Sequence, residues 1–149
     1  MQAINLPFKD RNFKLRIQNG VEEIWDVCRK KFVQLTPEER VRQHLIHLLI
    51  EDFHYPKGMI AVEKWIVAGR LRKRYDLVVY GKNLKAFLLI ECKAPNVPIS
   101  ETTLLQISNY QKTIKAPYLL LSNGAFSFLS SVQNNEIIWL DKLPKYEED

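Results

Sequence analysis

The chain has 149 residues, of which 46% are hydrophobic and 26% charged, a composition that is ordinary for one globular domain with a substantial core. It contains no apolar stretch long enough to span a bilayer and no signal peptide, so we expect a cytoplasmic protein that does not bind membranes. Its two cysteines predict no disulfide framework, and its net charge of +5 is compatible with a nucleic-acid partner without requiring one.

The first part of the chain predicts an arm, a hairpin and a helix. Residues 1–10 are expected to form a loosely held arm. Asn19-Gly20 is a turn signal, so residues 12–34 are predicted to form a β-hairpin added to the edge of a sheet. Thr36 is expected to cap the helix that follows. Glu39, three residues later, completes a capping box, and this local role explains Glu39 without a functional one.

Met59 to Val67 is predicted to be the first core strand, and Glu63 interrupts its apolar pattern. Glu63 either faces solvent or joins a site from this strand. A basic cluster follows, made of Arg70, Arg72, Lys73 and Arg74. Such clusters are usually solvated loops, but this one leads directly to Asp76, which favours contact with phosphate groups.

Residues 74–93 carry the strongest pattern in the sequence. Two apolar runs, 77–80 and 86–90, flank a short polar segment that contains Gly81, Lys82 and Asn83. This arrangement predicts a β-hairpin of two buried strands at the centre of a sheet.

The hairpin places several charged side chains at one end of the buried strands. Residues two apart on a strand share a face, so Glu91 and Lys93 should point the same way. A turn centred near residues 83–84 pairs Tyr80 with Phe87 and Asp76 with Glu91, on one face. A slip of one residue would send Asp76 to the other face, so this expectation depends on the register.

Two opposed carboxylates repel each other unless a cation or a proton lies between them. Mg²⁺ suits such a pair because it prefers oxygen ligands and usually binds only one or two carboxylates. The lysine beside them could orient water and offset phosphoryl charge, so the set is suited to metal-assisted phosphodiester hydrolysis. The alternative is an ordinary ion pair at a strand end, and spacing alone does not decide between the two. The side chain of Cys92 is expected to face the core.

The last part of the chain predicts a second helix over residues 101–115, capped by Ser100. Gln106 and Tyr110 share one face of it, either as a surface hydrogen-bonding pair or as part of a site. A buried strand at 118–121 then predicts a parallel crossover. Three further segments complete the expected chain: strands at 126–129 and 137–140, which would form a C-terminal hairpin, and a tail at 145–149.

Asp76 followed by Glu91-Cys92-Lys93 resembles the PD-(D/E)XK nuclease signature, although Tyr75 stands where the signature has proline. Gln106 to Tyr110 resembles the Q-x-x-x-Y element of type I restriction subunits. A wider set of segments resembles, in order, the N-terminal domain of the type I restriction enzyme R subunit in its small free-standing form. These segments are Leu35 to Gln43, Tyr55-Pro56, Glu91 to Pro95 and Ser122 to Gly124, within a resemblance that covers about residues 24–144.

The resemblance implies a single nuclease-like α/β domain over residues 1–149, with a restriction-endonuclease-like αβββαβ core at 36–122 and a mixed central sheet. It implies a DNA endonuclease that uses Mg²⁺, with Mn²⁺ able to substitute. The implied metal ligands are Asp76, Glu91 and the carbonyl of Cys92, and Lys93 would position or activate the water. Gln106 and Tyr110 would lie beside the metal, and Glu39 would be an auxiliary acid.

Two alternatives remain open. The chain could be a non-catalytic nucleic-acid-binding or assembly module that retains the nuclease fold, although such a module gains nothing from opposed buried carboxylates. It could also be a nuclease subunit that is active only in a complex. The sequence has no G-x-x-x-x-G-K-[ST] loop, so a translocase partner, or a specificity subunit, would be another chain.

Overall fold

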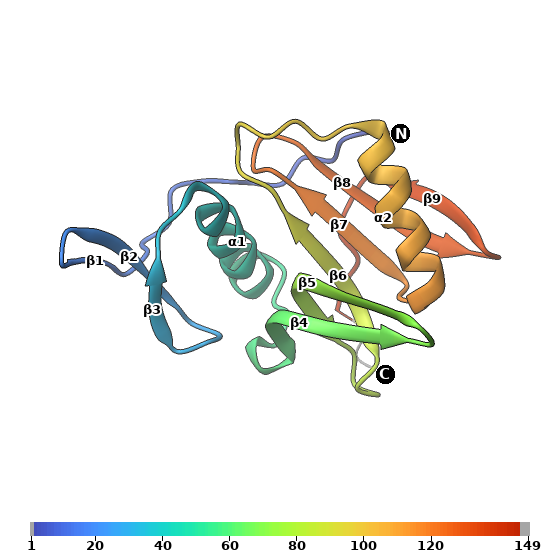
Figure 1. Ribbon diagram of the computed structural model, residues 1–149, viewed down its shortest axis with the longest axis horizontal. Coiled ribbons are helices and arrows are strands. Elements are labelled where there is room, and N and C mark those ends of the chain that lie inside the picture. Colours follow the sequence, from blue (N-terminus) through green and yellow to red (C-terminus); the bar gives the residue numbers. More distant parts are fainter. Residues whose placement is uncertain (1, 147–149) are drawn as a thin grey trace.

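The computed structural model describes residues 2–146, which form a mixed α/β fold built on two β-sheets (Figure 1). The larger sheet has six strands in chain order, with β6 and β7 parallel and every other neighbouring pair antiparallel. Its strands are β4 (Ile60–Ala68), β5 (Leu71–Tyr80), β6 (Ala86–Cys92), β7 (Tyr118–Ser122), β8 (Ser127–Gln133) and β9 (Glu136–Leu140). The mixed central sheet and the C-terminal β8–β9 hairpin were both predicted from the sequence.

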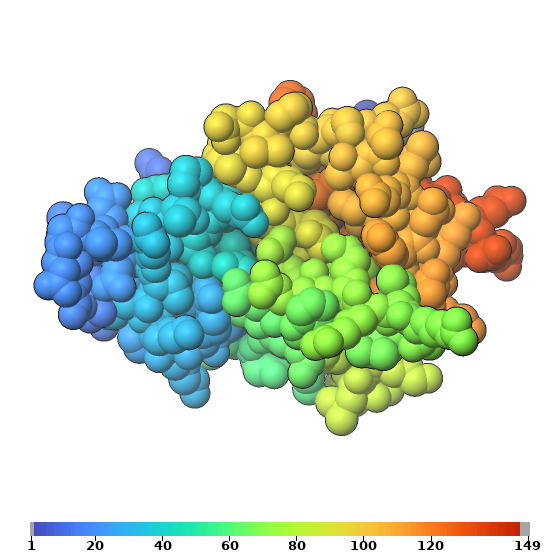
Figure 2. Space-filling view, in the orientation of Figure 1, coloured from blue at the N-terminus to red at the C-terminus, as the bar shows by residue number. Residues whose placement is uncertain are grey.

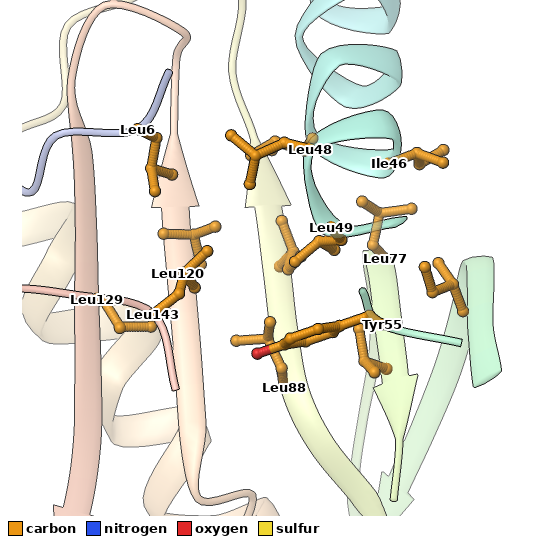
Figure 3. Close-up of a cluster of buried hydrophobic side chains, with 14 of the residues drawn as sticks. Leu6, Ile46, Leu48, Leu49, Tyr55, Leu77, Leu88, Leu120, Leu129 and Leu143 are labelled. Atoms are coloured by element: carbon orange, nitrogen blue, oxygen red, sulfur yellow. The ribbon is translucent and has the colours of Figure 1, made fainter. Parts of the chain in front are cut away.

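Two helices cover opposite faces of this sheet. Helix α1 (Pro37–His47) continues into a π-helical turn, η1 (Leu48–Asp52), and a 3₁₀ turn, η2 (Lys57–Met59), precedes β4. Side chains of α1 and η1 pack with alternate residues of β5, β6 and β7 to form the larger core cluster (Figure 3). Helix α2 (Glu101–Ile114) packs on the other face, through Leu104 and Ile107, against the intervening residues of the same strands. Within residues 2–146, no helix is long and apolar enough to cross a membrane.

The segment predicted as an N-terminal hairpin has three strands, not two. Strands β1 (Leu15–Gln18), β2 (Val21–Asp26) and β3 (Lys31–Gln34) form a separate antiparallel sheet beside α1 (Figure 1). Asp26 creates the unexpected turn, because its carboxylate accepts hydrogen bonds from the backbone N–H groups of Cys28 and Arg29 at 2.7 and 2.8 Å. This is an Asx-type turn, and it lacks the glycine that marks the first turn of the sheet.

The N-terminal arm is packed on the domain, contrary to the expectation of a loosely held segment. Ile4 and Leu6 are buried in the larger core cluster, and the Ile4 N–H donates to the carbonyl of Ser127 at 2.8 Å. Arg11 is also buried and pairs with Glu51 at 2.7 Å and Asp52 at 2.8 Å. The short apolar alternation of the arm therefore reflects burial, although the arm has no regular strand of its own.

At the other terminus, the hydroxyl of Tyr146 donates to the carbonyl of Tyr80 at 2.8 Å. This contact holds part of the expected tail against the sheet. The rest of that tail, residues 147–149, and Met1 of the arm lie outside the described residues.

Leu6→Ala is expected to lower the free energy of unfolding by about 2–4 kcal/mol, because it leaves a cavity in a packed core. Leu15→Ala is the matched control, since Leu15 is 53% exposed and Leu6 is 9% exposed. Urea unfolding followed by circular dichroism measures both changes. Equal, small effects of the two substitutions would show that the arm is not part of the cooperative core.

Candidate active site

The β5 strand inverts its pleat at Asp76. Leu77 faces the α1 side of the sheet, yet Tyr75, two residues away, packs on the α2 side. The opposite position on β4 is Glu63, whose φ of 53° lies in the left-handed region that a non-glycine residue rarely adopts. Pairing between β4 and β5 skips this position, with Val62–Leu77 on one side and Lys64–Tyr75 on the other. Local backbone irregularity of this kind is concentrated at functional sites.

The inversion turns the Asp76 carboxylate toward the end of β6. Pairing between β5 and β6 stops at Leu77–Ile90, so the backbone N–H of Cys92 has no β5 carbonyl to bind. Asp76 Oδ2 accepts that N–H at 2.6 Å, and Oδ1 lies 3.7 Å from Arg42 Nη1 of α1. Extending the register by one residue places Asp76 opposite Glu91. The predicted Tyr80–Phe87 pair is wrong, because an irregularity at Val79/Tyr80 pairs Tyr80 with Ala86.

Glu91 is buried on the α2 side of the sheet, next to Lys73. Lys73 Nζ lies 2.9 Å from Glu91 Oε1, but without hydrogen-bond alignment, so this buried oxygen has an ionic partner and no donor. Burial raises the pKa of the Glu91 carboxyl above its ordinary value of 4.5, and the nearby Asp76 carboxylate adds to the rise, while Lys73 and Lys93 oppose it. Glu91 is therefore an acid that a cation would stabilise in its charged form.

A pocket of about 340 Å³ lies over Glu91, between β5, β6 and α2. Lys93, Gln106 and Tyr110 also line it, so four of the five predicted catalytic residues meet here, together with Arg72 and Lys73 of the basic cluster. Within residues 2–146, Lys93 forms no ion pair, which leaves its ammonium group available to the pocket. Asp76 does not line this pocket, contrary to the expectation of one shared face, because its carboxylate lies at the boundary with the α1 side.

On the α1 side, Arg42 is the cation for three carboxylates. Its Nε and Nη2 atoms donate to the two oxygens of Glu39 at 2.8 and 2.7 Å, and it also approaches Glu63 at 3.4 Å and Asp76 at 3.7 Å. Glu39 accepts a further bond from Arg29 at 2.9 Å. The capping box is only half formed, because the Thr36 side chain accepts the Glu39 N–H while the Glu39 carboxylate turns to the arginines.

The predicted site residues did not include Asp26, Arg29 or Arg42, which extend this network into the small sheet. Asp26 is fully buried, accepts bonds from Arg29 Nε at 2.7 Å and Gln43 Nε2 at 3.0 Å, and so links the β2–β3 turn to α1. Burial alone would raise the pKa of Asp26, but these hydrogen bonds outweigh it and lower that pKa. Two signals were available, the basic run Arg29-Lys30-Lys31 and the common spacing Asp26-x-x-Arg29, and neither indicates which carboxylates Arg29 contacts.

The basic cluster divides between the two faces of the β4–β5 hairpin. Lys73, predicted to contact DNA backbone, is instead the ionic partner of Glu91. Arg70, Arg72 and Arg74 are exposed. Figure 2 shows the hairpin, in green, beside a hollow that is also bordered by α1, the segment after β6 and α2.

The donors at the end of β6 fit a hard divalent cation. Glu91 Oε1 is a buried oxygen whose partner is the Lys73 ammonium at 2.9 Å, and Asp76 Oδ1 has only the distant Arg42 contact. In the part of the chain that the structure describes, no three His, Cys, Asp or Glu side chains group as a metal site. The side chain of Cys92 is in the core, as predicted, so only its carbonyl could be a ligand. Two carboxylates, a carbonyl and water are compatible with Mg²⁺.

Glu91→Gln is expected to stabilise the metal-free protein at pH 7. Because the folded-state pKa of Glu91 is raised, the wild type loses stability as pH rises from about 4.5 through the folded-state value, and the variant does not. The difference should therefore vanish below about pH 4.5. Melting curves from pH 4 to 8 in EDTA measure it, with the exposed Glu136→Gln as control. A destabilised Glu91→Gln at pH 7 would contradict the burial argument.

Asp76→Ala is expected to destabilise the metal-free protein, whereas Glu91→Gln is expected to stabilise it, although both substitutions remove a carboxylate. It leaves the Cys92 N–H without its acceptor, a loss of about 1–3 kcal/mol for a buried group. Urea unfolding in EDTA measures the loss, and the exposed Asp141→Ala is the control. If Asp76→Ala raised stability, the Cys92 contact could not be what holds this carboxylate.

Arg42→Met is expected to destabilise the metal-free protein by about 3 kcal/mol or more, the scale for breaking a buried ion pair. Arg40→Met on the same helix is the control, because Arg40 is exposed. Mn²⁺ should restore part of the lost stability if the freed carboxylates gather a cation, measured as a shift of the melting temperature. Equal behaviour of the two variants would mean that Arg42 does not balance these acids.

Comparison with known proteins places this chain in a family. A search of the curated proteins finds no match. A family model described as Type I restriction enzyme R protein N terminus (HSDR_N) matches residues 37–144, which include α1, strands β4 to β9 and all the residues of the pocket. The match agrees with the resemblance inferred from the sequence motifs, and the chain belongs to the family of type I restriction enzyme R protein N-terminal domains.

Proposed function

We propose that this chain is a Mg²⁺-dependent DNA endonuclease of the restriction type, and that Mn²⁺ can replace Mg²⁺. The observation that carries the proposal is the bond from the Cys92 N–H to Asp76, which places this carboxylate at the backbone between Glu91 and Lys93 in a domain of a restriction-enzyme family. Two carboxylates and a lysine at the same end of two neighbouring buried strands are groups that suit metal-assisted phosphodiester hydrolysis. DNA is the proposed substrate.

Asp76, Glu91 and the Cys92 carbonyl would hold the metal. When bound, Mg²⁺ would polarise a phosphoryl oxygen and favour ionisation of the attacking water. Asp76 is fixed for this role because the Cys92 N–H holds Oδ2 and leaves Oδ1 as the freer oxygen. Lys73, whose Nζ lies 2.9 Å from Glu91 Oε1, balances the charge of Glu91 in the metal-free protein.

Lys93 would hold the scissile phosphate and the water in the transition state. Its ammonium lines the pocket, with no carboxylate of the described residues paired to it. Gln106 and Tyr110 form the facing wall on α2 and would contact the DNA or orient Lys93. Glu39 and Glu63 are assigned to Arg42 and not to the metal, because both already have this cation as a partner. The exposed Arg70, Arg72 and Arg74 would bind the DNA backbone.

Lys93→Met is expected to reduce single-turnover cleavage of plasmid DNA by roughly two or more orders of magnitude, the scale for losing one electrostatic stabiliser. Affinity for DNA should change little, because other cations contact the backbone. The measurement uses Mg²⁺ and Mn²⁺ at saturating enzyme, with the exposed Lys85→Met as control. A cleavage rate unchanged by Lys93→Met would remove Lys93 from the mechanism.

A second candidate function is a non-catalytic module that binds nucleic acid or assembles with other subunits. The observation that favours it is that both candidate ligands have protein cations nearby, Arg42 for Asp76 and Lys73 for Glu91. The family suggests other subunits as partners, such as a translocase or a specificity subunit. If the wild type cuts no DNA in either metal, alone or with such subunits, but still binds DNA, this second function replaces the first.

A further inference from the structure

The end of the β4–β5 hairpin carries an aromatic and basic surface, and the proposed function assigns a role to its arginines but none to its apolar side chains. Trp65 and Val67 lie on β4, directly opposite Arg74 and Arg72 of β5, so the four side chains share one face. Trp65 is 47% exposed and Val67 is 66% exposed. The guanidinium of Arg72 lies over the indole, 4.2 Å from its centroid. These four residues are called the hairpin face.

We propose that the hairpin face binds an unpaired base of a DNA strand, with Trp65 stacked on that base and Arg72 and Arg74 on the neighbouring phosphates. The inference rests on the proposed function, because it names the form of DNA that the site takes. Arg72 covers part of the indole, and the exposure of Trp65 leaves another part open. An exposed aromatic ring beside arginines is the usual combination for single-stranded nucleic acid.

Base stacking requires an unpaired nucleotide. Within a duplex each base already stacks on its neighbours, so an indole reaches a base face only at a strand end, in a single strand or at an extruded nucleotide. Arginines alone would bind the backbone of either form without preference. Trp65 is therefore the residue that distinguishes the two forms of DNA.

Charge favours nucleic acid over a protein as the occupant of this face. Residues 64–75, which include the whole turn of the hairpin, contain five basic side chains and no acidic one: Lys64, Arg70, Arg72, Lys73 and Arg74. Only Lys73 of these has a carboxylate partner in the described part of the chain. A hydrophobic pair inside an uncompensated basic segment suits a ligand that offers both phosphates and flat apolar rings.

The hairpin face also lies close to the candidate active site. Arg74 is two residues before Asp76 on β5, a separation of about 7 Å along a strand. Trp65 is two residues after Glu63 on β4, and Glu63 shares Arg42 with Asp76. A strand with one base on Trp65 would thus pass its neighbouring phosphates near Asp76.

The test compares two DNA ligands of equal length, a 20-nucleotide oligothymidylate and a blunt-ended 20-base-pair duplex without a loop, in EDTA so that no cleavage occurs. Trp65→Leu should weaken binding of the oligothymidylate by roughly ten-fold or more, the scale of one lost base stack, and should change duplex binding by less than about three-fold. Trp65→Phe should restore most of the single-strand affinity. Fluorescence anisotropy of labelled DNA gives the dissociation constants.

Trp25→Leu is the matched control. Trp25 also lies on a β-sheet beneath a cation, with Lys14 Nζ 5.0 Å from its ring, but it belongs to the small sheet and not to the β4–β5 hairpin. It should leave both affinities unchanged. Melting curves of every variant check that the fold is kept. Because Trp65 is partly exposed, Trp65→Leu should change the melting temperature little.

Three results would overturn the inference. The first is unchanged single-strand affinity in Trp65→Leu, and the second is an equal loss for both DNA forms. The third is a wild-type dimer, seen by light scattering, that Trp65→Leu converts to a monomer, which would make the hairpin face a contact between copies of this chain. The proposed function is tested separately, and it fails if the wild type cuts no DNA in either metal. None of the three results above would contradict it.

Discussion

The hydrogen bond from the Cys92 N–H to Asp76 Oδ2 is the contact on which the geometry of the candidate site depends. It takes the place of the backbone ladder at the point where β5 leaves β6, so the strand can invert its pleat without leaving a buried N–H unpaired. The same bond fixes one oxygen of Asp76 and directs the other outward. One carboxylate therefore both pairs the buried Cys92 N–H and holds its second oxygen where a candidate metal ligand would be needed.

The two candidate ligands differ in how the protein balances their charge. Asp76 is held by a backbone donor and is approached by Arg42, whereas Glu91 is buried with an ionic partner and no aligned donor. Asp76 is therefore a preorganised carboxylate, whereas the charged form of Glu91 is destabilised by burial and is favoured only by nearby cations.

The sequence predicted the fold class, the central hairpin and the helices, because these depend on apolar periodicity and on cap and turn residues that act locally. Strand alternation predicted that Glu91 and Lys93 share a face, and helix spacing predicted the same for Gln106 and Tyr110. Only the family resemblance implied that the two pairs lie together. The sequence did not predict the pleat inversion at Asp76, because the alternation rule assumes a regular strand. The left-handed backbone opposite Asp76 is at Glu63, whereas sequence reasoning expects such a conformation at glycine. It missed the third N-terminal strand because the turn depends on the side chain of Asp26.

The small sheet has a further consequence for where this domain begins. The family match starts at residue 37, after β3, yet the chain of contacts that reaches Asp76 starts at Asp26 and runs through Arg29, Glu39 and Arg42. The start of the family match at residue 37 thus separates Asp26 and Arg29 from the residues that they contact on α1. A protein trimmed to the matched segment would keep every candidate ligand and lose one of the two arginines that neutralise Glu39. The set of charges that supports the candidate site therefore extends beyond the segment that sequence similarity identifies.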